Sequence, residues 1–149
     1  ESVAGNGNRE LSYRILGNAH EDVLTAFETY QKTAYKHLVR QMFPAEEAQR
    51  MIAKRAIGNR FQNVDRATDL YEKLSINPFS VLTADELELM KLNIEKRHVI
   101  GHNLSMTDEA YSYANAHDMP GTTVDILADQ VSEFAQTAKK VVLELEPLL

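Results

Sequence analysis

The stretch TADELELMKLNIEKRHVIGH, residues 83–102, contains the signals that start and end one amphipathic helix. Thr83 and Glu86 have the spacing of a capping box, in which each side chain accepts a hydrogen bond from the other residue's backbone N–H group. Gly101 lies where a helix would stop. Between these signals the residues of one face recur at intervals of three and four: Leu87, Met90, Ile94 and His98. The stretch therefore predicts a helix that turns one face towards a core.

The same periodicity predicts three further helices in the rest of the chain. They are expected from about His20 to Met42, from just after Pro44 to about Leu74, and from Thr122 or Thr123 to about Leu145. Gly58 is expected to break or bend the second of these. Neither a strand pair nor an internal repeat is visible, so the predicted fold is all-α, a four-to-five-helix up-and-down bundle. The near-heptad spacing of the last helix predicts a face for a second copy of the chain.

A single helical domain is expected over residues 18–149, since the length of 149 residues suits one domain. Residues 1–17 begin with the Gly- and Asn-rich sequence ESVAGNGN and are predicted to be a flexible lead-in. The chain starts at Glu1 rather than Met, which is compatible with an upstream domain in the same polypeptide. The connection from Asn103 to Gly121 is long for a compact helical domain, and such connections often carry function.

Composition excludes several classes of protein. With 44% apolar residues the chain is globular rather than disordered, and no apolar run reaches the roughly 18 residues of a membrane span. The absence of cysteine rules out disulfides and thiolate metal sites and favours a cytoplasmic protein. A net charge of −6 argues against a general nucleic-acid binder, although the segment from Arg50 to Arg66 is locally positive.

Arg97 and His102 stand out because of where they lie on the helix predicted for residues 83–102. On a wheel of about 100° per residue, they flank the buried face on its two sides. An arginine at the rim of a core needs an acceptor, or a ligand that supplies one. The last turn of a helix also favours cations. Two interpretations follow: these residues cap the helix C-terminus, or they line a cleft for an anion.

The chemistry of this pair suits the cleavage of RNA without a metal or cofactor. Histidine exchanges protons near neutral pH, so His102 can take the proton of a ribose 2′-hydroxyl or give one to the leaving 5′-oxygen. The guanidinium of Arg97 would stabilise charge on the five-coordinate phosphate. The products would be 2′,3′-cyclic phosphate and 5′-hydroxyl ends. Because one histidine does not easily serve as acid and base in one step, a homodimer partner is expected to supply the second.

The sequence RHVIGHN, residues 97–103, on a late helix of a short all-α domain resembles the HEPN family (higher eukaryotes and prokaryotes nucleotide-binding). The family signature is an arginine, usually followed by Asn, Asp or His, with a histidine four to six residues later; Arg97, His98 and His102 match it. The resemblance implies a dimer with a composite cleft. It also implies a metal-independent endoribonuclease of a toxin–antitoxin, phage-defence or RNA-processing system, with RNA and an antitoxin as partners. Other members of the family are inactive binding or scaffold modules.

Further residues are candidates for substrate binding around this pair. His98 and Asn103 adjoin the motif, and the stretch GNRFQNVDRA, residues 58–67, resembles the family's second long helix. The polar residues expected to line the cleft are Asn59, Asn63, Arg66, His98 and Asn103. Each is equally an ordinary surface, turn or core residue.

A metal site remains an alternative for the two histidines of the motif. His98 and His102 have the i, i+4 spacing of a zinc-binding pair, but zinc requires further ligands. The long connection contains residues that are able to supply them: Asp108, Glu109 and His117. No second paired motif exists, so no metal is predicted.

Overall fold

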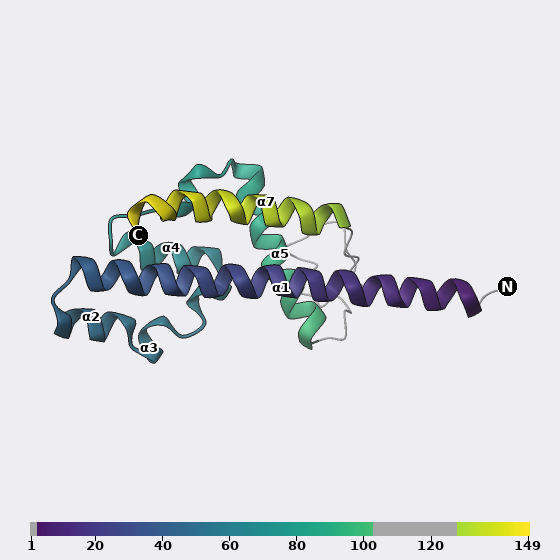
Figure 1. Cartoon of the computed structure of the whole chain (residues 1–149), viewed down its shortest axis with the longest axis horizontal. Coiled ribbons are helices and arrows are strands. Elements are labelled where there is room, and N and C mark those ends of the chain that lie inside the picture. The colour runs from purple at the N-terminus through teal and green to yellow at the C-terminus, as the bar shows by residue number, and fades with distance from the viewer. Residues whose placement is uncertain (1–2, 103–127) are drawn as a thin grey trace.

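The computed structural model describes the backbone of residues 3–102 and 128–149, and the side chains of residues 14–97 and 128–149. Every regular element in these ranges is helical, which confirms the all-α class (Figure 1). The α-helices are α1 (Val3–Met42), α2 (Ala45–Ile52), α3 (Lys54–Ile57), α4 (Val64–Glu72), α5 (Ala84–His102) and α7 (Ala128–Leu145). Short 3-10 turns complete the set: η1 (Arg60–Gln62), η2 (Pro78–Val81) and η3 (Glu146–Leu148).

Helix α1 is the long axis of the molecule, and α7 runs beside it (Figure 1). The two helices are parallel, because Tyr30 donates a hydrogen bond to the carbonyl of Val142 at 3.4 Å, and further along His37 contacts the carbonyl of Leu149 at 3.2 Å. In an up-and-down bundle the first and last helices are antiparallel when there are four helices and parallel when there are five, so this pair fits five segments rather than four. The chain makes an additional reversal between them, at the point where the second predicted helix is broken.

That predicted second helix, from Pro44 to Leu74, is divided into α2, α3, η1 and α4. The backbone leaves the helical conformation at Ala53, with ψ 145°, at Gly58, with φ 50° and ψ −129°, and at Asn63, with φ −151°. Only glycine adopts the Gly58 conformation without strain. The apolar spacing of this segment nevertheless marks buried side chains: Ile57, Phe61, Val64 and Tyr71. Thr68, at the same spacing, is half-buried.

Helix α1 begins at Val3 rather than near His20, so most of the predicted lead-in is helical. Extending an existing helix adds one hydrogen bond for each residue that is ordered, whereas starting a new one is costly. The helix therefore continues through residues 3–17 in spite of their glycines. Whether these residues form a separate flexible unit stays a prediction.

The capping box predicted at the start of α5 is confirmed. The backbone N–H of Thr83 donates to Glu86 Oε2 at 3.0 Å, and the backbone N–H of Glu86 donates to Thr83 Oγ1 at 3.2 Å. Met90 and Ile94 are buried on the predicted face. The helix passes the stop predicted at Gly101 and reaches His102, where the described range ends.

Helix α7 packs on α1 and α5 through a buried face that consists of Phe134, Thr137, Ala138, Val141 and Leu145. Its predicted start at Thr122 or Thr123, and the connection from Asn103 to Gly121, lie outside the described residues. No helix in the described ranges has the length and apolar character needed to cross a membrane.

Candidate functional site

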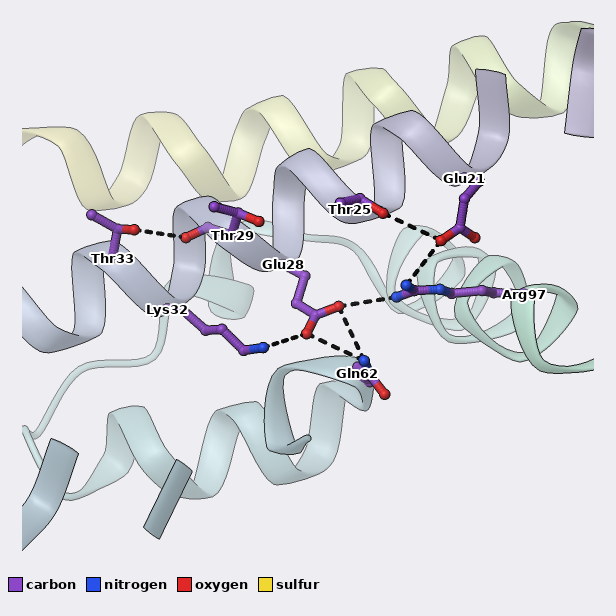
Figure 2. A network of polar contacts seen from close by, with 8 residues as sticks. All are labelled: Glu21, Thr25, Glu28, Thr29, Lys32, Thr33, Gln62 and Arg97. Carbon is purple, nitrogen blue, oxygen red and sulfur yellow. Dashed lines mark hydrogen bonds and ion pairs between the residues drawn. The ribbon is translucent and has the colours of Figure 1, made fainter. Parts of the chain in front are cut away.

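Arg97 extends from α5 towards α1, where two glutamates receive its guanidinium (Figure 2). Its Nη1 donates to Glu28 Oε2 at 3.0 Å, and its Nη2 contacts Glu21 Oε1 at 2.9 Å. The Arg97 side chain is 24% exposed, which agrees with its predicted position at the rim of the core. The acceptor that such an arginine requires is therefore supplied by the chain itself.

Glu28 is the inner partner of Arg97 and the centre of a small network. Lys32 contacts Glu28 Oε1 at 2.5 Å, and Gln62 Nε2 lies 3.3 Å from both carboxylate oxygens (Figure 2). Burial raises the pKa of Glu28, but hydrogen bonds from Lys32, Arg97 and Gln62 outweigh it and leave the pKa below its ordinary value. Glu28 is therefore ionised and firmly held at neutral pH.

Glu21 is the outer partner, and its environment differs. Its side chain is 48% exposed, against 10% for Glu28. The only other described contact of the Glu21 carboxylate is a hydrogen bond from Thr25 Oγ1 at 3.2 Å. Exposed ion pairs of this kind contribute little, because water competes for both partners. Glu21, Glu28, Lys32, Gln62 and Arg97 are called the carboxylate cluster below.

A second buried polar pair lies close to this cluster. Asn93 on α5 receives a hydrogen bond at its Oδ1 from His20 Nε2 at 3.1 Å and donates to the carbonyl of Leu89 at 2.8 Å. His20 is 1% exposed and its ring also contacts Phe134. Burial lowers the pKa of His20, an effect that the hydrogen bond to Asn93 partly opposes. Neutral His20 therefore links α1 to α5 beside the carboxylate cluster.

Three of the other predicted substrate residues have described side chains: Asn59, Asn63 and Arg66. Asn63 caps α4, since its Oδ1 accepts a hydrogen bond from the backbone N–H of Arg66 at 3.0 Å. Asn59 and Arg66 are exposed. No described contact joins these three residues to Arg97. Instead Gln62, from the same stretch, reaches the carboxylate cluster through Glu28.

The remaining motif residues are only partly described. His98 and His102 belong to α5, but their side chains lie outside the described range, as does all of Asn103. The metal alternative depends on His98, His102, Asp108, Glu109 and His117, whose side chains are equally undescribed. Within the described ranges, no group of three His, Asp or Glu side chains has an arrangement that suits a metal ion.

Sequence reasoning missed both glutamates, although a signal was present. Glu21 and Glu28 are one heptad apart on α1, so they share one side of that helix. Glu28 follows Phe27 directly and falls between Leu24 and Gln31, which are both buried. A glutamate within a buried stripe requires a cationic partner, and that requirement could have been matched with Arg97.

Comparison of the chain with protein-family models, with curated proteins and with solved structures found no match. The resemblance to the HEPN family therefore depends on residues 97–103 and on the helical architecture. The described site adds a partly exposed guanidinium that is fixed to a second helix. Arginine forms paired hydrogen bonds with phosphate oxygens, so Arg97 has the chemistry of a phosphate-binding residue.

Proposed function

We propose that this chain is a metal-independent endoribonuclease of a toxin or phage-defence type, in which Arg97 and His102 act on the scissile phosphate. The observation that supports this most strongly is the state of Arg97. Its guanidinium is bound by Glu28 and by the half-exposed Glu21, its side chain is 24% exposed, and the same helix carries His102. A fixed and partly exposed cationic side chain is the kind of group that stabilises charge on a phosphoryl group.

In the proposed reaction the ribose 2′-oxygen attacks phosphorus, and the bond from phosphorus to the 5′-oxygen breaks. One imidazole accepts the 2′-hydroxyl proton, and another donates a proton to the departing 5′-oxygen. On an ideal helix, Arg97 and His102 are separated by about 7.5 Å along the axis and by about 140° around it. One helix therefore does not direct both side chains at one phosphate. Two copies of α5 in a homodimer would supply both histidines.

A labelled single-stranded RNA incubated with the protein in EDTA tests this proposal. We expect Arg97→Ala to lower the cleavage rate by about 10²–10³-fold and His102→Ala by about 10²–10⁴-fold. A 2′-deoxy substitution at the cleaved nucleotide should abolish cleavage there, because it removes the nucleophile. The products should carry 2′,3′-cyclic phosphate and 5′-hydroxyl ends.

Matched controls are available on α1. Arg40→Ala and His37→Ala remove the same residue types from exposed positions outside the carboxylate cluster, and neither should slow cleavage. Circular dichroism of each variant checks that the helical fold is kept. Cleavage by His102→Ala at the wild-type rate would rule the proposal out.

A non-catalytic module that binds RNA, a nucleotide or a partner protein is the second candidate function. The observation that favours it is the occupation of Arg97 by two carboxylates of its own chain, which lowers its attraction for a phosphate. The partner protein would then be an antitoxin or an upstream domain of the same polypeptide. In this case wild-type protein would bind its ligand and never cleave RNA, and Arg97→Ala would lose binding.

A further inference from the structure

We propose that Glu21 is a displaceable counter-ion that holds the phosphate position on Arg97 until RNA binds, while Glu28 stays in place and orients the guanidinium. This inference rests on the proposed function, because the entering group is a phosphodiester of the RNA bound at this site. It assigns opposite roles to two glutamates that contact the same side chain. Glu21 competes with the substrate, and Glu28 is a positioning residue.

The two contacts use different terminal nitrogens of the guanidinium. Glu28 uses Nη1 and Glu21 uses Nη2, and both carboxylates come from α1 (Figure 2). A phosphate that replaces Glu21 therefore meets Nη2, while the bond from Nη1 to Glu28 continues to fix the side chain. The guanidinium is able to carry one acceptor on each of its terminal nitrogens.

Burial decides which of the two glutamates leaves. Displaced Glu21 would regain full hydration with little movement, because almost half of its side chain is already exposed. Glu28 is buried, and Lys32 and Gln62 hold its oxygens in addition to Arg97. Removing a buried carboxylate from such partners is unfavourable, since it would leave Lys32 and Gln62 without their acceptor.

Charge balance favours a one-for-one exchange. In the free chain, the charges of Glu21 and Glu28 are matched by those of Arg97 and Lys32. When Glu21 turns away, one positive charge remains uncompensated in the cluster. A phosphodiester carries a single negative charge, so its entry restores the balance that the glutamate provided.

The test uses a fluorescent 2′-O-methyl oligonucleotide, which retains phosphodiesters but has no 2′-hydroxyl for cleavage. We expect Glu21→Gln to bind it about two- to fivefold more tightly than wild-type protein, because the substitution removes one exposed ion pair that competes with the phosphate for Arg97. Asp22→Asn is the matched control, because it makes the same change in net charge at an exposed neighbour with no described contact to Arg97. Asp22→Asn should bind within twofold of wild type.

Two results would overturn the exchange. One is Glu21→Gln binding no more tightly than Asp22→Asn, which would show an effect of net charge alone. The other is the absence of measurable binding by every variant. Glu21→Gln should also lose its advantage in an Arg97→Ala background, since the competition acts through that guanidinium.

The proposal that Glu28 positions Arg97 is tested by measuring kcat and KM separately, because a purely structural role would not change kcat selectively. With cleavable RNA, Glu21→Gln should lower KM and leave kcat near the wild-type value. Glu28→Gln, folded by circular dichroism, should lower kcat more than it changes KM, because Arg97 is no longer held where charge develops. If Glu21→Gln and Glu28→Gln changed KM by the same factor and kcat by the same factor, the assignment of different roles to the two glutamates would be contradicted.

The failures of the two proposals are distinguishable. Protein that binds the oligonucleotide as expected but never cuts RNA contradicts the ribonuclease function and leaves the exchange intact. Protein that cuts RNA but shows no specific gain with Glu21→Gln contradicts the exchange alone.

Discussion

Two regions pack against the same helix α1 and are stabilised by different physics. Towards its C-terminal end lies the aromatic cluster of Tyr35, Phe61 and Tyr71, in which every pair of ring centroids is 5.8 Å apart. Closer to its middle lies the carboxylate cluster around Arg97. The first region consists of packed aromatic rings, and the second consists of ion-paired side chains that are partly exposed to solvent. Apolar packing of rings stabilises the first region, and pairing of partly exposed charges stabilises the second.

The boundary between the two regions runs through neighbouring residues of η1. Phe61 enters the aromatic cluster, whereas Gln62 reaches Glu28 in the carboxylate cluster. The tight turn of η1 directs these two side chains to different parts of α1. The short segment η1 therefore connects the aromatic cluster with the carboxylate cluster, and substitutions in the two clusters are expected to have different effects.

The largest expected effect is Phe61→Ala in the aromatic cluster. Phe61 is buried and contacts two other rings, so its removal should lower the free energy of unfolding by about 3–5 kcal/mol. Denaturation in urea measures the change. Tyr71→Phe, which removes only the hydrogen bond from its hydroxyl to the Gln31 carbonyl, should cost about 1 kcal/mol. A loss below 1 kcal/mol for Phe61→Ala would show that the rings are not the main source of stability.

The next largest effect is expected from Arg97→Met in the carboxylate cluster. It leaves buried Glu28 without one of its partners, and the free energy of unfolding should fall by about 2 kcal/mol. Lys32 still compensates the charge, which limits the loss. The double variant Arg97→Met, Glu28→Gln should be more stable than the sum of the single changes predicts. Simple additivity in urea denaturation would mean that the two side chains do not interact.

A smaller effect is expected at Gly58, which turns the chain ahead of η1. At φ 50° and ψ −129° an alanine is strained even though no atom lies near the position of its Cβ. Gly58→Ala should therefore lower stability by about 1 kcal/mol and disturb both regions. Gly17→Ala is the control, since Gly17 is helical with equal space around it, and alanine there should stabilise α1 by about 0.5–1 kcal/mol. The thermal midpoints of the two variants should move in opposite directions.

The smallest expected change is a pH dependence confined to the carboxylate cluster. The pKa of Glu28 is lowered in the folded chain, so its stabilising contribution is fully present above the ordinary value of 4.5 and is lost as pH falls through the folded value. The difference in stability between wild type and Glu28→Gln at neutral pH should therefore shrink below about pH 4.5. Phe61→Ala has no such group, and its cost should stay constant over that interval. Equal pH dependence in both variants would contradict this account.

Much of the local structure was predictable because its signals lie close together in the chain. The capping box of Thr83 and Glu86, the buried positions Met90 and Ile94, and the rim position of Arg97 all follow from spacings of three or four residues. The break at Gly58 was anticipated as well. The two further breaks, at Ala53 and Asn63, were not anticipated, because neither residue type by itself ends a helix.

The sequence by itself determined that the chain is helical, which faces are buried, and that Arg97 needs an acceptor. Only the tertiary structure decided that the acceptors are Glu21 and Glu28, that Gln62 reaches Glu28, and that α1 and α7 run parallel. The physical reason is that periodicity reports the environment of a side chain along its own helix. The identity of its partner depends on how distant segments are brought together, and that information is not contained in local spacing.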